Sequence, residues 1–392
     1  MNKNEFHLLK VYLYDTKQLR LFFYDMLHIV RKEVVEITDC MIQKNWVKGP
    51  HIALYFKILG EKNEKEVLAK LESCIQEKLS SFENSVTNAD YEKYEQLSQR
   101  LARAERYPGD LVPLKENKTI DYSLFNLADI KTVYDVSLYR EIEVAKTKFF
   151  LEHYPLLKKM TEEEKELLST KLMLIVANQY FIEFDQEVLK GIKYGYMSFK
   201  SHYEGFNMQL LRMDPSKRTL IEQKINEQSD LMQQFLADFG SFVQQIDDSF
   251  IQYYENDKAL LVEWKNVTSR LDELFKEGLQ NKQIQFEEYH DISSFVQSSN
   301  KMSEFHNEFV DGDGFSQFSK SIGFLKYRLL VNFLYSVFPL LNISPLQKNK
   351  LCKIISDASE SYFQFSWKDL KALRGDTYDG DDIYEKIGTK RS

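Results

Sequence analysis

The spacing of apolar residues changes from every second to every third or fourth position, and back again, between residues 1 and 90. A strand is predicted by the alternation in HLLKVYLYD, and a helix by the following DTKQLRLFFYDMLHIVRKEV, which begins behind an Asp15 or Thr16 cap. Two further strands are predicted by MIQKNW and HIALYFKI, and an amphipathic helix by EKEVLAKLESCIQEKL. Strand, helix, two strands and helix form the opening of a split βαβ, ferredoxin-like layer.

Helical spacing dominates from about residue 137 onward. Thr161 is predicted to cap one helix, with Glu164 at the third helical position, and Ser344 to cap another, with Pro345 at the first. Between these helices, residues 217–307 have apolar side chains near every third or fourth place, which favours long helices that pack on one another.

The chain is therefore predicted to be an α+β protein, with an N-terminal ferredoxin-like sheet layer and a large C-terminal helical portion. Residues 106–126 contain two of the seven prolines and are typical of an extended connector. We expect an α+β part at residues 1–125, a mainly helical part at residues 126–375 and a flexible tail at residues 376–392.

Charge and hydropathy limit the classes of partner. A net charge of -8 argues against nucleic acid binding, since proteins of that class use a basic surface to neutralise phosphates. No stretch approaches the roughly 18 uninterrupted apolar residues of a membrane span. The most apolar run, FLKYRLLVNFLYSVFPLL, contains Lys326 and Arg328 and is predicted to be a buried core helix. We expect neither a nucleic acid nor a membrane partner.

The N-terminal sequence and the cysteines bear on location. The stretch MNKNEFHLLKVYLYD has no apolar core bounded by a small-residue cleavage site. Cys40, Cys74 and Cys352 are far apart and have no Cys-x-x-Cys spacing, so neither a disulfide framework nor a zinc site is indicated. A cytoplasmic location is therefore expected.

A first group of candidate site residues lies on the strand predicted at residues 51–58. Because residues two apart share a face, His51, Ala53, Tyr55 and Lys57 line one side of it, and the other side is apolar. An imidazole, a methyl, a phenol and an amine suit either a solvated sheet face or the wall of a cavity.

A second group lies in GYMSFKSHYEGF, residues 195–206. Hydroxyls, an imidazole and a carboxylate are gathered within two helical turns, and histidine is the side chain best suited to move protons near neutral pH. The group consists of Ser198, Ser201, His202, Tyr203 and Glu204. The alternative interpretation is that Ser201 and His202 cap the start of a helix.

Motifs for the commoner catalytic classes are absent from the sequence. It contains no Gly-x-Gly-x-x-Gly, no Walker loop, no His-Glu-x-x-His and no Gly-x-Ser-x-Gly. Nucleotide, zinc and triad hydrolase chemistry therefore lack their usual support, and we expect neither a cofactor nor a metal.

Three separated segments carry a family resemblance when they are taken together. They are Trp-x-x-Gly-Pro-His-Ile-x-Leu-x-Phe at residues 46–56, Ser-Phe-Lys-Ser-His at residues 198–202, and Leu-Leu-Asn-Ile-Ser-Pro-Leu-Gln-Lys-Asn-Lys-Leu at residues 340–351. In this combination the chain resembles the thiopeptide-type bacteriocin biosynthesis proteins, stand-alone relatives of the glutamate-elimination domain of lanthipeptide dehydratases. The order and spacing of the segments cover nearly the whole chain.

The resemblance implies action on a ribosomally made precursor peptide that carries a leader, with other enzymes of the same pathway as further partners. Eliminating members of the family expel glutamate from glutamylated Ser or Thr and typically have two arginines in Gly-Pro-His-x-Arg-Leu-Arg-Phe. In this chain, the positions of those two arginines are occupied by Ala53 and Tyr55. Eliminating members carry a further arginine, for which Lys146 is the nearest cation in this sequence. A fork of fixed guanidinium donors is what a departing carboxylate requires.

Pyridine synthases share the fold without the glutamate machinery and join two dehydroalanines in a formal aza-Diels-Alder closure. The resemblance thus favours such a cyclisation, with catalytic roles for Tyr55, Ser201, His202, Tyr203 and Glu204. His51, Ala53, Ser198 and Lys146 are the corresponding candidates for substrate binding. Glutamate elimination and a non-catalytic subunit that binds the leader are the two alternatives. From the ferredoxin-like layer we expect the leader to be captured by strand addition to the N-terminal sheet.

Overall fold

The computed structural model describes residues 4–59, 64–105, 107–179, 190–226, 239, 257–286, 303–310, 321–364 and 366–369. The chain forms two compact units, and each is described by itself. Unit 1 is Met1–Met160 with Pro339–Asn342, and unit 2 is Thr161–Phe338 with Ile343–Ser392. The tail expected at residues 376–392 lies outside the described residues.

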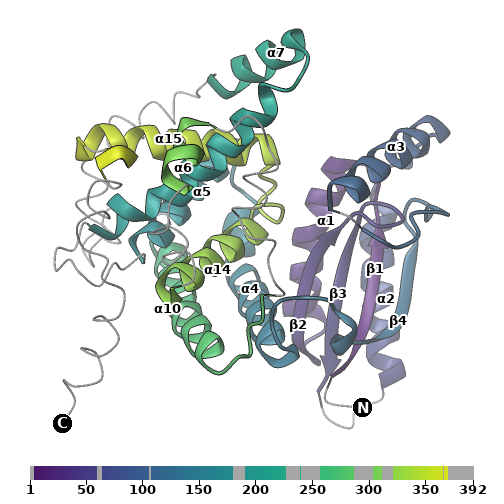
Figure 1. Cartoon of the computed structure of the whole chain (residues 1–392). Helices are drawn as coiled ribbons and strands as arrows, with labels where there is room; N and C mark the ends of the chain where they lie inside the picture. The colour runs from purple at the N-terminus through teal and green to yellow at the C-terminus, as the bar shows by residue number, and fades with distance from the viewer. Residues whose placement is uncertain are drawn as a thin grey trace, which may run out of the picture. The chain divides into compact units, whose positions relative to one another are not determined.

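Unit 1 is built on a four-stranded antiparallel sheet with the order β2-β3-β1-β4 (Figure 1). The strands are β1 (Glu5–Tyr12), β2 (Ile37–Asn45), β3 (His51–Ile58) and β4 (Ile120–Asn126). With the helices between them, this is the arrangement of a ferredoxin-like layer. The predicted α+β fold class is confirmed.

The last strand was not expected as a strand. β4 falls in the segment assigned to an extended connector, and the expected boundary at residue 125 lies inside it. Its backbone pairs along most of β1, from Glu5 opposite Asn126 to Val11 opposite Ile120. The connector interpretation was wrong for these residues because the two prolines lie before the strand, in residues 107–119.

The helices of unit 1 are α1 (Thr16–His28), α2 (Glu64–Ser80), α3 (Asn88–Glu105) and α4 (Val136–Leu157). Asp15 is the N-cap of α1, since its carboxylate accepts a hydrogen bond of 2.8 Å from the Gln18 backbone N–H. α1 packs near β3, and α4 packs against β2. Both faces of the central strand β3 are therefore buried along most of its length.

The described part of unit 2 consists of helices. They are α5 (Glu162–Asn178), α6 (Lys190–Leu210), α7 (Pro215–Asn226), α10 (Lys258–Gln280), α12 (Glu304–Val310), α14 (Ile322–Val337) and α15 (Pro345–Phe363). α6 packs on α5, α12 and α15, while α14 packs on α10. The predicted helices of residues 217–307 are observed as α7, α10 and α12, and the rest of that range lies largely outside the described residues.

Several local predictions for unit 2 are confirmed. Thr161 and Glu164 form a reciprocal capping box at α5, and Ser344 with Gln347 forms another at α15, where Pro345 takes the first helical position. The run predicted to be a buried core helix overlaps most of α14, whose Leu330 and Leu334 are fully buried. None of the described helices is both long and apolar enough to cross a membrane.

A close approach of two helices holds α6 in place. A Cβ atom added at Gly195 would lie far inside van der Waals contact with the Ala177 carbonyl oxygen of α5. The Tyr327 hydroxyl of α14 donates a buried hydrogen bond of 2.7 Å to the carbonyl oxygen of Gly195. Glycine is required at this point because only a residue without a side chain permits the contact.

Candidate functional site

The predicted site residues belong to two sets. His51, Ala53 and Tyr55 are on β3, and Lys146 is on α4, so all four belong to unit 1. Ser198, Ser201, His202, Tyr203 and Glu204 are on α6 of unit 2.

His51 is part of the corner that joins β2 to β3. Its side chain is only 2% exposed, its Nδ1 lies 2.8 Å from the Gly49 carbonyl oxygen, and its ring packs on Tyr12 at 4.6 Å. Gly49 has a φ of +130°, which strains any other residue, and the Tyr94 hydroxyl donates to the Trp46 carbonyl oxygen at 2.8 Å. The Trp-x-x-Gly-Pro-His motif thus builds a rigid corner.

The pKa of His51 follows from this burial. Desolvation disfavours the charged imidazolium and lowers the pKa to about 4, although the hydrogen bond to Gly49 acts in the opposite direction. His51 is therefore neutral at pH 7, and the contacts of its ring support the corner.

Ala53 and Tyr55 face an apolar cluster between the sheet and α4. The buried members of the cluster are Phe6, Leu8, Met41, Ala53, Tyr55 and Leu127. Ala53 is 1% and Tyr55 is 9% exposed, and the Tyr55 ring meets Phe125 edge to face at 5.3 Å. The interpretation of this strand face as solvated is therefore wrong: α4 covers it.

A buried polar network borders the cluster. Lys146 Nζ donates to Glu143 Oε1 at 2.7 Å, and Gln43 Nε2 donates to Glu143 Oε2 at 2.8 Å and to the Tyr139 hydroxyl at 2.9 Å. Burial, followed by the negative charge of Glu143, raises the pKa of Tyr55 to about 12. Tyr55 is thus a neutral phenol, and Lys146 is a buried cation with a carboxylate partner.

The α6 candidates lie inside the helix. Ser201 and His202 are more than two turns from its first residue, so the interpretation that they cap a helix start is wrong. Successive residues of a helix point about 100° apart. Ser201, His202, Tyr203 and Glu204 therefore cannot converge on one point, and they separate into two faces.

We call the first of these the serine-histidine face, defined by Ser198, Ser201, His202 and Gly205. A Cβ atom at Gly205 would meet no atom of the described residues within 4 Å, so these residues leave the space in front of this face open there. Ser201 Oγ lies 3.3 Å from Nε2 of His306, which α12 supplies. Hydroxyls and imidazoles beside open space provide hydrogen-bond donors and acceptors for a polar ligand.

His202 is an exposed residue beside positive charges on this face. The residue keeps solvent-exposed surface, and its ring meets the Tyr335 ring edge to face at 4.8 Å. Desolvation by the surrounding protein, followed by the charges of Lys348 and Arg328, lowers the pKa of His202 to about 3. A neutral imidazole is therefore present throughout the physiological pH range.

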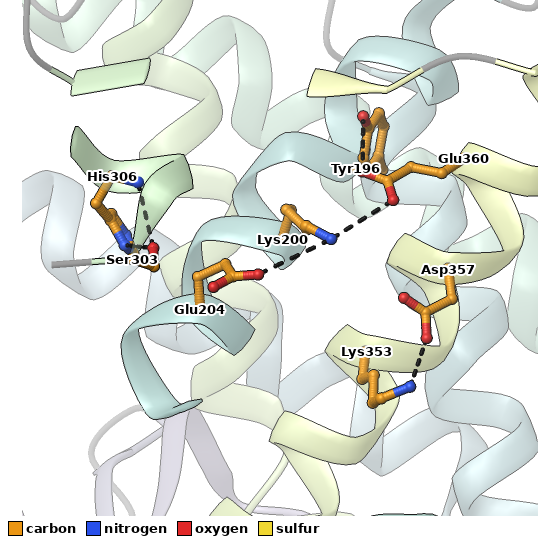
Figure 2. Close-up of polar contacts among 8 residues, drawn as sticks. All are labelled: Tyr196, Lys200, Glu204, Ser303, His306, Lys353, Asp357 and Glu360. Carbon is orange, nitrogen blue, oxygen red and sulfur yellow. Dashed lines mark hydrogen bonds and ion pairs between the residues drawn. The ribbon is translucent and has the colours of Figure 1, made fainter. Parts of the chain in front are cut away.

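The opposite face of α6 packs on α15 through charges, as Figure 2 shows. Lys200 Nζ lies 3.5 Å from a carboxylate oxygen of Glu360 and 3.9 Å from one of Glu204. The Tyr196 hydroxyl lies 3.5 Å from the other Glu360 oxygen, and Lys353 Nζ is 5.9 Å from the centre of the Tyr203 ring. Tyr203 and Glu204 are thus on the helix-packing side of α6.

Sequence reasoning missed His306, Tyr335 and Glu360. Each lies more than 100 residues after the α6 residue that it contacts, and they belong to α12, α14 and α15. No spacing argument joins residues so far apart, because only tertiary packing brings them to α6. Among the described residues, no three His, Cys, Asp or Glu side chains are placed together as metal ligands.

Comparison with known proteins gives the fold. No protein-family model matches the chain, and no curated protein matches it significantly. The solved structure of the pyridine synthase TbtD, from thiomuracin biosynthesis, aligns with a TM-score of 0.63 at 15% identity, covering 93% of this chain and 100% of that chain. The crystal structure of TsrL aligns with a TM-score of 0.59 at 12% identity, covering 94% and 98%. The predicted resemblance is confirmed at the level of the fold: over nearly its whole length, the chain has a fold similar to that of a pyridine synthase.

Proposed function

We propose that this protein is an enzyme of ribosomal peptide biosynthesis that closes a pyridine ring from two dehydroalanines of a leader-bearing peptide. The observation that carries the proposal is the alignment of 93% of the chain with the whole of a pyridine synthase. The candidate residues on β3 and α6 are also of suitable types for this reaction, since they offer neutral hydrogen-bonding groups.

The surroundings of Ala53 and Tyr55 favour cyclisation over glutamate elimination. Both side chains lie in an apolar cluster, and no arginine is buried in the described part of the chain. Arg140 of α4 pairs with Asp39, and both side chains keep solvent contact. A glutamyl carboxylate would find no bidentate donor beside these two residues, whereas a neutral peptide needs none.

The proposed reaction is redox-neutral. An amide proton moves from the nitrogen of one dehydroalanine to the preceding carbonyl oxygen, which gives a 2-azadiene. Two C–C bonds then form to the alkene of the second dehydroalanine. Loss of the hydroxyl as water, and of the leader as its carboxamide, makes the ring aromatic. Holding the two alkenes close together lowers the activation free energy of such a ring closure by roughly 7 to 11 kcal/mol.

The serine-histidine face supplies groups for the proton transfers. Ser198 and Ser201 can donate to the amide oxygen as it becomes a hydroxyl, and His202, being neutral, can accept or return a proton. Tyr55 of unit 1 is a neutral phenol and is the further hydrogen-bond donor that we propose for the reaction. Tyr203 and Glu204, which face α15, would support the reaction through the position of α6.

The leader-bearing peptide is the proposed partner, and the sheet offers an edge for it. β4 is the last strand of the described sheet, and its Tyr122 and Leu124 are 43% and 55% exposed. An extended leader could add to this edge as a further strand. A titration in which the leaderless core peptide binds as tightly as the full peptide would contradict this mode of capture.

Mass spectrometry of a leader-bearing peptide with two spaced dehydroalanines, incubated with the purified protein alone, tests the proposed function. We expect loss of water and release of the leader. The same protein should leave glutamate on a glutamylated peptide, which is the matched control. Glutamate release without cyclisation would replace the proposal by elimination, and leader binding without any mass change would replace it by a non-catalytic role.

A further inference from the structure

Ser201 belongs to a chain of three polar side chains that joins α6 to α12. Nε2 of His306 lies 3.3 Å from Ser201 Oγ, and Nδ1 of His306 lies 2.9 Å from Ser303 Oγ. Ser303 precedes α12 and caps it, because its Oγ accepts a hydrogen bond of 3.2 Å from the His306 backbone N–H. Figure 2 shows Ser303 and His306 side by side.

Counting protons along this chain selects one tautomer of His306. Ser303 Oγ already accepts one N–H, so donation of its own proton to Nδ1 uses both functions of the hydroxyl. With Nδ1 as an acceptor, the ring proton resides on Nε2 and is donated to Ser201 Oγ. In the opposite tautomer, Nδ1–H would donate to Ser303 Oγ, which would then accept two hydrogen bonds. The Ser303 hydroxyl proton could no longer be donated to the imidazole.

The consequence falls on Ser201. Its oxygen accepts from His306, so its own hydroxyl proton is directed away from His306 and remains available for another acceptor. That proton lies on the serine-histidine face, where the space at Gly205 is open. Desolvation lowers the pKa of His306, which keeps the ring neutral and the order of donors unchanged near pH 7.

We propose that His306 is a positioning residue, fixed by Ser303, that holds Ser201 as a hydrogen-bond donor toward a substrate amide carbonyl. This inference rests on the proposed function for the identity of the acceptor. His306 acts through Ser201 and needs no contact with the peptide. The donor assists the transfer of the amide proton to oxygen that starts the cyclisation.

The tautomer can be measured without substrate. Long-range ¹H–¹⁵N spectra of the full-length protein labelled with ¹⁵N-histidine distinguish Nε2–H from Nδ1–H rings, and His306→Gln identifies the resonance. We expect Nε2–H in the wild type and a shift toward Nδ1–H or a mixture in Ser303→Ala. Ser303→Thr, which keeps both the cap and the hydroxyl, is the matched control and should resemble the wild type. An Nδ1–H ring in the wild type would overturn the inference.

Kinetics on the peptide with two dehydroalanines test the action through Ser201. His306→Ala should lower kcat by roughly tenfold with little change in KM, and the same substitution in a Ser201→Ala background should have no further effect. His306→Gln, whose amide N–H can reach the position of Nε2–H, should recover part of the rate. An equal loss in both backgrounds would show that His306 acts independently of Ser201.

Failure of the inference and failure of the proposed function remain distinguishable. A wild-type protein that releases no leader from the peptide overturns cyclisation, and the spectra alone then decide the hydrogen-bond order at Ser201. Thermal unfolding of every variant shows whether a kinetic loss comes from misfolding. A His306→Ala protein with native stability and wild-type kcat would overturn the positioning role.

Discussion

At the scale of single residues, burial gives three histidines different properties. His51 is enclosed by the β2–β3 corner, His202 keeps solvent contact beside positive charges, and His306 is held between two serines. The pKa of each is lowered, with desolvation as the first cause. A histidine in a sequence motif therefore cannot be assigned a role in proton transfer until its surroundings are known. His51 is the clearest example, because its ring is enclosed by the corner.

His51 should make folding sensitive to acid. Its pKa is about 4 in the folded chain and about 6.5 when unfolded, so the unfolded state binds more protons between these values. Stability should fall as pH decreases from about 6.5 to about 4 and be insensitive to this group below that range. The full contribution of His51 to the free energy of unfolding is about 3 kcal/mol. Urea unfolding of wild type and His51→Asn at pH 7 and pH 5 checks it, and equal pH dependence in the two proteins would contradict it.

The Tyr55 hydroxyl can be separated from the Tyr55 ring. Tyr55→Phe keeps the contact with Phe125, so the melting temperature should stay near that of the wild type, while cyclisation should slow by roughly tenfold or more. Tyr139→Phe is the matched control, because it removes a neighbouring, partly buried phenol that accepts a hydrogen bond from Gln43 and should cost only about 1 kcal/mol of stability. Unchanged turnover in Tyr55→Phe would leave this residue with a packing role alone.

At the scale of elements, α6 shows how one helix serves two purposes. One face supports the helix on α15 through Lys200 and Glu360, and the other carries the half-buried Ser198 and Ser201 together with Gly205. Helical geometry alone assigns residues to these faces once the helix is known. The hydroxyls and the carboxylate that are close together in the sequence therefore fall into two groups. One group lies on the candidate site face of α6, and the other lies on the face that packs on α15.

Two glycines of α6 should respond oppositely to alanine. Gly195→Ala forces a methyl group against the Ala177 backbone and should destabilise the protein by about 1 to 3 kcal/mol. The methyl group of Gly205→Ala meets no atom within 4 Å in the described part of the chain and should stabilise the helix by up to about 1 kcal/mol, because alanine restricts the unfolded chain. Thermal unfolding of the two variants measures the difference. Similar melting temperatures would mean that α5 and α6 lie further apart than described.

Elements with regular apolar spacing could be predicted from the sequence, and those stabilised in other ways could not. β1, β3, α1, α2 and α14 follow their spacing, and the caps at Thr161 and Ser344 are local signals. α3 was missed because its contacts use Tyr91 and Tyr94, which pack on Tyr14, in place of an aliphatic stripe. The partners of α6 were beyond reach because contacts between distant segments leave no spacing to detect.

At the scale of the whole molecule, the chain passes between the units more than once. It leaves unit 1 after Met160, returns for Pro339–Asn342, and leaves again before Ile343. Within unit 1, Lys44 Nζ donates to the Asn342 side-chain oxygen at 2.6 Å and to the Pro339 carbonyl oxygen at 3.0 Å. A short segment between α14 and α15 is thus part of the packing of the N-terminal unit.

This connectivity makes a prediction about where a distant substitution acts. Leu341 is fully buried in the segment that belongs to unit 1, so Leu341→Ala should cost about 2 to 5 kcal/mol and accelerate hydrogen exchange most in β2 and β3. Leu330→Ala, in α14 and also fully buried, is the matched control and should act most on α10, against which α14 packs. Hydrogen exchange read by mass spectrometry resolves these segments. If Leu341→Ala instead loosened α10 and spared β2, the segment would stabilise the helical unit, and the sheet that carries Tyr55 would be independent of it.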